Sequence, residues 1–313
     1  MPVLKPRKLR KRDIIGLVAP ASPPSDPEKI DRGVRYLESI GYRVKVGKHA
    51  RNVHGYLAGT DEQRAEDMNA MFRDSSVKAI FVVRGGYGLH RIIHQLDYRS
   101  IRRSPKIVVG YSDLTALQLA LWRKIGLVTF SGPMVAVEMS EGMDPFTEEH
   151  FWKVLTSTTK LGALPAPAGE SIRSMQSGKA TGTLLGGNLS VLCALTGTPF
   201  CPAWKQALLV LEEVGEEPYR IDRMLMHLLH AKVLSSVKGL AFGQFINCQP
   251  QDASKPHLTV EQVVDHVTRD LNFPVVANLA YGHLPRKVTL PWGLRARIDG
   301  DRGRIEILES AVV

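Results

Sequence analysis

Cysteine is scarce in this sequence, and the three residues that occur are not arranged in pairs. Cys193, Cys201 and Cys248 form no C-x-x-C motif. An odd, sparse set is typical of a reducing compartment rather than of a disulfide framework. No apolar run approaches the roughly 20 residues that a membrane helix needs. We therefore expect a cytoplasmic protein with no disulfide scaffold and no membrane span.

Concentrated basic charge is confined to one end of the sequence, although the formal net charge is +10. Residues 1–12 contain six lysines and arginines and no acidic residue. Such a segment can touch nucleic acid or an anionic membrane, but the rest of the sequence lacks basic stripes with interleaved aromatic residues. We therefore expect residues 1–12 to form a solvated, partly disordered tail, and we expect neither nucleic-acid nor membrane binding.

Residues 13–160 alternate between short apolar segments and segments with helical spacing. The first apolar stretch, Ile14 to Ala19, is shorter than the core of a secretory signal, so we interpret it as a buried strand. The alternation predicts an N-terminal domain with a parallel sheet covered by helices on both faces. Strands are expected at 13–20, 42–47, 77–84, 106–110 and 127–133, and helices at 27–41, 60–74, 89–96, 114–126 and 147–157.

The composition changes in residues 161–179, which are rich in Ala, Gly, Pro and Ser and have weak periodicity. This change predicts a linker between two domains. Residues 180–313 again mix apolar strand-like segments with helical ones. They predict a smaller C-terminal domain of mixed α/β type.

Motifs for metals and dinucleotides are absent from the sequence. His90 and His94 are four residues apart, as in H-E-x-x-H, but Arg91 stands where that motif has glutamate. The glycines of "VVRGGYG" do not have the G-x-G-x-x-G spacing of a dinucleotide site. We therefore expect neither a metal nor a cofactor.

A serine stands at a strand-to-helix turn in "KIVVGYSDLTALQLAL", residues 106–121. Ser112 resembles the nucleophile of a G-x-S-x-G elbow, although Leu114 occupies the place of the second glycine. Ser and Asp are also preferred helix caps, so this pattern alone leaves a structural interpretation open.

Glycines follow a neighbouring strand in "VVRGGYG", residues 82–88. Arg84 closes that strand, and Gly85 and Gly86 open the next segment. Glycines let the backbone approach a ligand, and free N–H groups at a helix start attract anions. The same glycines are equally suited to a tight turn.

A nucleophilic serine needs a base, and the base needs an orienting acid. His283 follows an apolar strand in "PVVANLAYGH", where it is either catalytic or structural. Glu212 and Glu213 end the apolar strand "LLVLEE", and alternation places their side chains on opposite faces. One of them can face a cleft, or both can be solvated charges.

Six segments of the sequence, in order, resemble the LD-carboxypeptidase family of serine peptidases. This family includes the muramoyltetrapeptide carboxypeptidases and the microcin C self-immunity peptidases, and the resemblance spans about residues 13–300. The segments are "IGLVAPAS", "VVRGGYG", "VVGYSDLTAL", "GTLLGGNLSVL", "LLVLEEVGEEPYRIDRML" and "YGHLPRKVTLPWG".

The resemblance implies a Ser-Glu-His triad at the cleft between two domains. By motif, Ser112 is the nucleophile, Glu212 the orienting acid and His283 the base. It also implies that the backbone N–H groups of Gly86 and Asp113 bind the oxyanion. Family members usually have aspartate after the triad glutamate, whereas this sequence has a second glutamate.

The family also implies a substrate and a cellular role. Muramoyltetrapeptide carboxypeptidases release terminal D-alanine from murein tetrapeptide in cytoplasmic cell-wall recycling, commonly as homodimers. We expect Arg84, Gly85 and Asn188 to contact the substrate, with Arg84 near its carboxylate. The alternatives are a microcin-immunity-like peptidase that cleaves a peptidyl-nucleotide amide, and a non-catalytic protein that binds an anionic ligand.

Overall fold

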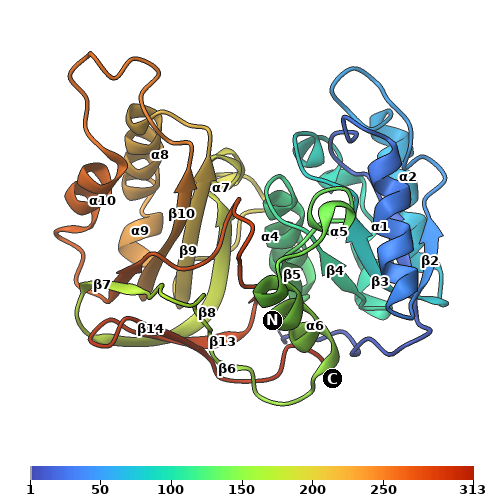
Figure 1. Cartoon of the computed structure of the whole chain (residues 1–313). Helices are drawn as coiled ribbons and strands as arrows, with labels where there is room; N and C mark the ends of the chain where they lie inside the picture. Colours follow the sequence, from blue (N-terminus) through green and yellow to red (C-terminus); the bar gives the residue numbers. More distant parts are fainter. Residues whose placement is uncertain (1) are drawn as a thin grey trace.

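The computed structural model describes residues 2–313, which form two sheets side by side (Figure 1). The first sheet has the strand order β12-β5-β4-β3-β1-β2. Five of its strands run parallel, and β12 pairs antiparallel with β5. Its strands are β1 (Ile14–Val18), β2 (Arg43–Val46), β3 (Val77–Val82), β4 (Ile107–Val109), β5 (Thr129–Ser131) and β12 (Leu290–Trp292).

The helices of the first domain agree with most of the expected helical segments. The expected helix over 89–96 is instead two 3-10 turns, Leu89–Arg91 and Ile93–Gln95. The carbonyl of Gln95 accepts from the Asn69 side chain at 3.1 Å. The α-helices are α1 (Glu28–Ser39), α2 (Asp61–Arg73), α3 (Tyr98–Arg103), α4 (Leu114–Ile125), α5 (Glu138–Glu141) and α6 (Pro145–Thr156).

The second sheet is mixed, with the strand order β6-β14-β13-β8-β9-β10-β11-β7. Its four central strands β8 to β11 run parallel, and antiparallel strands flank them. The strands are β6 (Gly162–Ala163), β7 (Arg173–Gln176), β8 (Lys179–Asn188), β9 (Ala207–Val214), β10 (Gly239–Ile246), β11 (Val275–Ala277), β13 (Arg295–Asp299) and β14 (Arg304–Ile307). The helices are α7 (Leu189–Leu195), α8 (Pro218–His230), α9 (Val233–Ser236) and α10 (Val260–Thr268).

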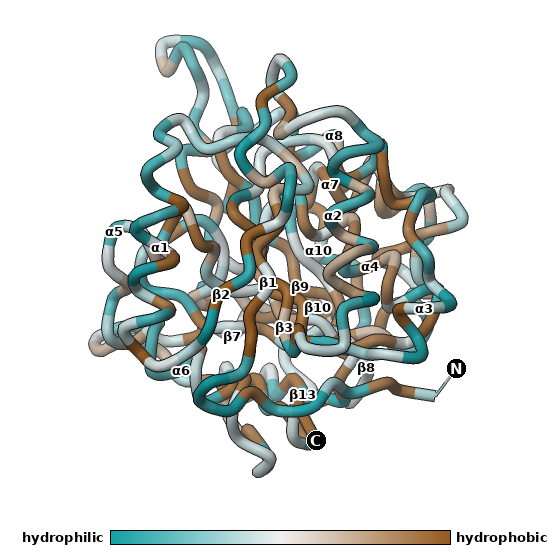
Figure 2. Tube along the Cα trace, turned by 90° about the vertical axis from the view of Figure 1, so that its right-hand side faces the viewer, coloured by the Kyte–Doolittle hydropathy of each residue, from teal (hydrophilic) through white to brown (hydrophobic). Residues whose placement is uncertain are grey.

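Apolar residues of both sheets share one main core, and a small second cluster around Ile30 and Val83 lies in the first domain. Figure 2 shows the apolar strands β1, β3, β9 and β10 near the centre of the molecule. A single cluster of buried side chains extends from the strands of the first sheet to those of the second. Helix α4 contacts both β5 and β8, which explains why nine of its twelve residues are buried. The two domains are therefore joined by packing as well as by the chain.

Three segments depart from the expected domain boundaries. Residues 161–179, expected to be a linker, contain β6 and β7, which are the two edge strands of the second sheet. Strand β12 lies in the sequence of the second domain but completes the first sheet. Residues 278–289 therefore cross from one sheet to the other.

The expectation of a solvated, partly disordered tail covers residues 1–12; residue 1 lies outside the described residues, and over residues 2–12 the expectation is wrong. Leu9 is only 2% exposed, and Leu4 pairs with Leu127. The Lys8 N–H donates to the carbonyl of Val313 at 2.9 Å. Apolar residues interspersed among the basic ones anchor this segment, while most of the charged groups face outwards.

Candidate active site

Ser112 stands in a sharp turn between β4 and α4. Its φ of 63° lies in the left-handed region, which costs a residue with a Cβ about 1–2 kcal/mol. Asp113 is the N-cap of α4, and no side-chain capping hydrogen bond is present there among the described residues. Ser112 is therefore not the helix cap. A strained, half-buried serine at a strand end is typical of a functional position.

The Gly85–Gly86 loop lies directly against Ser112. A Cβ on Gly85 would stand 2.9 Å from the Ser112 Cβ and 3.1 Å from its Oγ. Gly86 has a φ of 109°, and a Cβ there would collide with the Oγ of Ser22. The Tyr87 N–H donates to that same Oγ at 3.1 Å, which fixes the loop. Glycine at both positions therefore lets the loop backbone approach Ser112.

Asp113 ties the serine turn to the end of the glycine loop. Its carboxyl group accepts a hydrogen bond from the Leu89 N–H at 2.9 Å. The residue is 2% exposed, and burial raises the pKa of Asp113 to about 6. The side chain thus has a structural role, and the predicted oxyanion donors are the backbone N–H groups of Gly86 and Asp113. Their role stays a prediction.

Glu212 and His283 form a hydrogen-bonded pair at the end of β9. The Glu212 Oε2 lies 2.8 Å from the His283 Nδ1. Glu212 is fully buried, whereas the His283 side chain is 19% exposed. A Cβ on Gly282 would lie 3.0 Å from Oε2, and one on Gly243 would lie 3.3 Å from the Glu212 Cβ. These two glycines make room for the carboxylate beside the imidazole.

Glu213 points to the other face of β9 and has a different set of partners. Its carboxylate accepts hydrogen bonds at 2.8 Å from Asn188 Nδ2, Ser190 N and Val214 N. Burial raises the pKa of Glu213, although these donors oppose the shift. The contacts support the start of α7. Of the two glutamates that the sequence leaves open, it is Glu212 that contacts His283.

Asn188 and Arg84, two of the predicted substrate contacts, differ in burial and in their hydrogen-bond partners. Asn188 is 3% exposed, and its Oδ1 accepts from Val191 N at 3.2 Å as the N-cap of α7. Arg84 is half-buried beside Gly85, and its Nη1 donates to the carbonyl of Pro23 at 3.2 Å. Their contacts with substrate stay predictions. Asn188 already has a structural role that accounts for its presence.

Tyr111 links the serine turn to the Glu212–His283 pair. Its ring meets the His283 imidazole edge-on, with centroids 4.9 Å apart. Because Tyr111 directly precedes Ser112, this contact places the Glu212–His283 pair next to the serine turn. Tyr111 also contacts Glu138 and Lys287, which were not among the predicted site residues. Three separate segments supply these side chains, so no local motif marks them.

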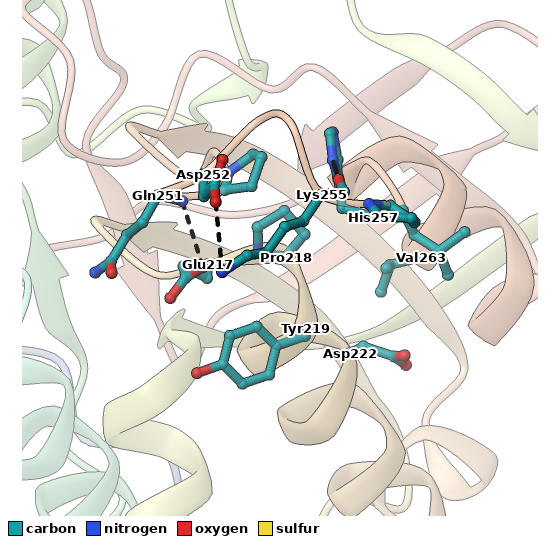
Figure 3. A pocket seen from close by; sticks show the side chains of 12 residues that line it. Glu217, Pro218, Tyr219, Asp222, Gln251, Asp252, Lys255, His257 and Val263 are labelled. Carbon is teal, nitrogen blue, oxygen red and sulfur yellow. Dashed lines mark hydrogen bonds and ion pairs between the residues drawn. The ribbon is translucent and has the colours of Figure 1, made fainter.

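Two hollows are lined by residues of the second domain. One, of about 440 Å³, lies between the start of α8 and residues 250–258. Figure 3 shows side chains that line it, among them Tyr219. The other, of about 950 Å³, adjoins β10 and α10. Neither is lined by Ser112, Glu212 or His283.

Residues 2–313 contain neither a cluster of metal ligands nor a membrane-spanning helix. No group of three or more His, Cys, Asp or Glu side chains within this range could hold a metal ion. No helix in the same range combines the length and the apolar character needed to cross a bilayer.

Two family models match the two halves of the chain. The LD-carboxypeptidase N-terminal domain matches residues 15–132, and the LD-carboxypeptidase C-terminal domain matches residues 181–298. The chain belongs to the LD-carboxypeptidase family. The "Probable murein peptide carboxypeptidase" of Bacillus subtilis (strain 168) is 39% identical over 301 residues, which cover 94% of this chain and 91% of that protein.

Solved structures of this family share the architecture. Microcin C7 self-immunity protein MccF, in an inactive mutant apo state, gives a TM-score of 0.91 at 26% identity and covers 99% of this chain and 100% of its own. Muramoyltetrapeptide carboxypeptidase from Oxalobacter formigenes gives 0.84 at 30% identity, with coverage of 96% and 100%. The resemblance read from the sequence is confirmed, as is a two-domain α/β fold.

Proposed function

We propose that this LD-carboxypeptidase hydrolyses the L,D-peptide bond of murein tetrapeptide and releases terminal D-alanine. The observation that carries the proposal is the Glu212–His283 hydrogen bond of 2.8 Å, held against Tyr111 and hence beside Ser112. A buried acid, an imidazole and a strained serine are the three groups of a serine hydrolase. We place the reaction in cytoplasmic peptidoglycan recycling and expect a homodimer.

The reaction follows from the roles of these side chains. Ser112 Oγ attacks the carbonyl carbon of the scissile bond, and His283 takes the hydroxyl proton. Glu212 holds Nδ1 of the imidazole, so that Nε2 is left to act as the base, and it stabilises the imidazolium. The backbone N–H groups of Gly86 and Asp113 receive the oxyanion, each contributing about 3 kcal/mol in comparable sites.

The second half of the reaction regenerates the serine. His283 returns its proton to the amine of D-alanine, which leaves as the tetrahedral intermediate collapses to an acyl-enzyme. Water, deprotonated by the same imidazole, then attacks the ester, and the imidazolium gives that proton to the departing Ser112 Oγ as the tripeptide is released. Arg84, beside the glycine loop, is our choice for the cation that faces the carboxylate of D-alanine.

The stereochemistry of the bond provides the test. Ser112 and the oxyanion donors stand on fixed strand ends, and a misplacement of about 1 Å can cost on the order of a hundredfold in rate. We expect D-alanine from the tetrapeptide, while the terminal D,D-bond of the pentapeptide stays intact. A time course of both peptides, with the released amino acid resolved by chirality, measures this. Comparable rates on both, or release from the D,D-bond alone, would reject the assignment.

A second candidate is a peptidase of the microcin-immunity type, which cuts an amide in a peptidyl-nucleotide. It is favoured by the TM-score of 0.91 with MccF. The same Ser112, Glu212 and His283 would serve it. Parallel assays on murein tetrapeptide and on an aminoacyl sulfamoyl adenosine separate the two, because each substrate class presents a different leaving group. Binding without turnover of either would favour a non-catalytic role.

A further inference from the structure

Lys287 is a buried cation close to the candidate base. It is 2% exposed and lies on residues 278–289, which also carry His283. Its Nζ makes a short ion pair with Glu138 Oε1 and stands 3.8 Å from the centroid of the Tyr111 ring. Burying a lysine is costly unless it is paired, so this position calls for an explanation.

Glu138 connects this lysine to the serine turn. Its Oε1 accepts a hydrogen bond from the Tyr111 hydroxyl at 2.9 Å, and its Oε2 accepts from the Met134 N–H at 2.9 Å. Burial, and next the charge of Glu138, raise the pKa of Tyr111, which keeps the hydroxyl protonated as a donor. The Tyr111 ring is thus fixed at its hydroxyl by Glu138 and on its face by Lys287.

The same contacts fix the segment that carries the histidine. The Lys287 N–H donates to Thr147 Oγ1 at 2.8 Å, and that hydroxyl donates to the Pro285 carbonyl at 2.8 Å. Thr147 belongs to α6 and Glu138 to α5, so both anchors come from the first domain. The crossing segment is therefore held on the domain that carries Ser112.

We propose that Lys287, Glu138 and Tyr111 are positioning residues that hold the His283 imidazole towards Glu212 and balance the charge around it. The inference rests on the proposed function, in which His283 is the base. The Tyr111 ring packs in a T-shaped arrangement against the imidazole, while Lys287 and Glu138 act through Tyr111. An imidazole bound at Nδ1 and packed at its edge keeps one orientation, which proton transfer requires.

The protonation of the His283 imidazole depends on the titratable groups around it. Two titratable groups contact the imidazole directly, Glu212 from β9 and Tyr111 before α4. Glu138 from α5 and Lys287 from the crossing segment contact Tyr111, and Tyr281 of the same segment interacts with the charge of Glu212. The ion pair is neutral as a whole. Removing one member therefore leaves an uncompensated charge, of opposite sign in the two cases.

Two single variants should move the pH dependence in opposite directions. Glu138→Gln leaves the Lys287 cation, which disfavours imidazolium, so the acid limb of the rate should move to lower pH. Lys287→Met leaves the Glu138 anion, which favours imidazolium, so the limb should move to higher pH. Each displacement should be on the order of half to one pH unit. The limb of the double variant should return close to the wild-type position.

The experiment measures kcat and KM for murein tetrapeptide against pH, together with an NMR titration of the ¹³C-labelled His283 imidazole. Each single variant should lower kcat about tenfold with KM little changed, because orientation and not binding is lost. Lys106→Met is the matched control. Lys106 is also buried, at 3% exposure, but contacts the carbonyls of Met71 and Asp74 away from the site. It should leave the acid limb in place.

The NMR titration separates the two proposals. Shifts of opposite sign without hydrolysis of any murein peptide would support the positioning residues and reject the proposed function. Hydrolysis with an unchanged titration of His283 in both single variants, or shifts of the same sign, would overturn the positioning proposal alone. The double variant keeps the test valid if one single variant fails to fold, because it leaves no unpaired charge.

Discussion

The two sheet edges that meet at the candidate site contribute in different ways. The first sheet contributes backbone geometry: Ser112 has a φ of 63°, and Gly85 leaves no room for a Cβ. The second sheet contributes a pair of charged side chains, Glu212 and His283, of which the acid is fully buried. The first edge should therefore be sensitive to added volume, and the second to altered charge.

The difference follows from what surrounds each edge. Close backbone approach costs little where glycines replace side chains, but one methyl group can displace the loop. The buried Glu212 carboxylate is stabilised by its hydrogen bond to His283, and the same bond orients the imidazole. A neutral substitute for Glu212 therefore changes the orientation of the histidine. Changes that act on charge alone and changes that act on volume alone should separate these two roles.

The largest effect is expected from Glu212→Gln, compared with Glu213→Gln. Replacing the acid of such a triad by its amide typically lowers kcat on the order of 10⁴-fold, because the imidazole loses its orienting acceptor. Glu213→Gln should lower stability and leave kcat within a few-fold, because Glu213 supports α7. Steady-state kinetics and urea unfolding measure both. Equal losses of kcat would show that Glu212 and Glu213 do not have the separate catalytic and structural roles assigned to them.

A smaller effect is expected from Gly85→Ala. The added Cβ would stand 2.9 Å from the Ser112 Cβ, so the loop or the serine must shift. A shift approaching 1 Å should cost on the order of a hundredfold in kcat. Gly197→Ala is the control, since it has a φ of 86° and no neighbour within 4 Å. It should cost stability alone, and full activity of Gly85→Ala would refute the close approach.

The smallest effects concern the pH dependence of the free energy of unfolding. The buried side chains of His150 and Asp113 should affect it with opposite signs. Burial lowers the pKa of His150 to about 4 from 6.5, so its contribution to stability is lost as pH falls from about 6.5 to 4. Burial raises the pKa of Asp113 to about 6 from 3.8, so its contribution is present in acid and lost as pH rises through that window.

Variants at these two positions should change the slope of the free energy of unfolding against pH in opposite directions. Urea unfolding between pH 4 and 7 should give a flatter dependence for His150→Gln and a steeper loss in acid for Asp113→Asn. Each displacement in the free energy of unfolding is about 3 kcal/mol or less across the window. The same slope in both variants and the wild type would mean that neither group titrates differently in the folded protein.

Local patterns in the sequence predict the elements that carry Ser112 and Glu212. Each stands where an apolar strand ends, and strand ends are recognisable because periodicity stops there. The alternation of faces in β9 shows that one glutamate must point away from the other, and the structure shows which one meets His283.

Other features depend on long-range pairing, which leaves no local signal. Strand β12 is short, and its place beside β5 is decided by packing against a segment more than a hundred residues earlier. The buried pair of Glu138 and Lys287 likewise joins two segments that each look like ordinary surface sequence. The apolar residues of the basic tail, such as Leu9, find their pocket only in the folded protein.

Ser112→Ala, assayed for D-alanine release from murein tetrapeptide beside the wild-type protein, tests the nucleophile most directly. Alanine meets the same left-handed backbone as serine at this position, so the variant should fold with nearly unchanged stability. Loss of the attacking oxygen should lower the rate by a thousandfold or more. A folded Ser112→Ala variant that keeps more than a few per cent of the wild-type rate would contradict the serine mechanism.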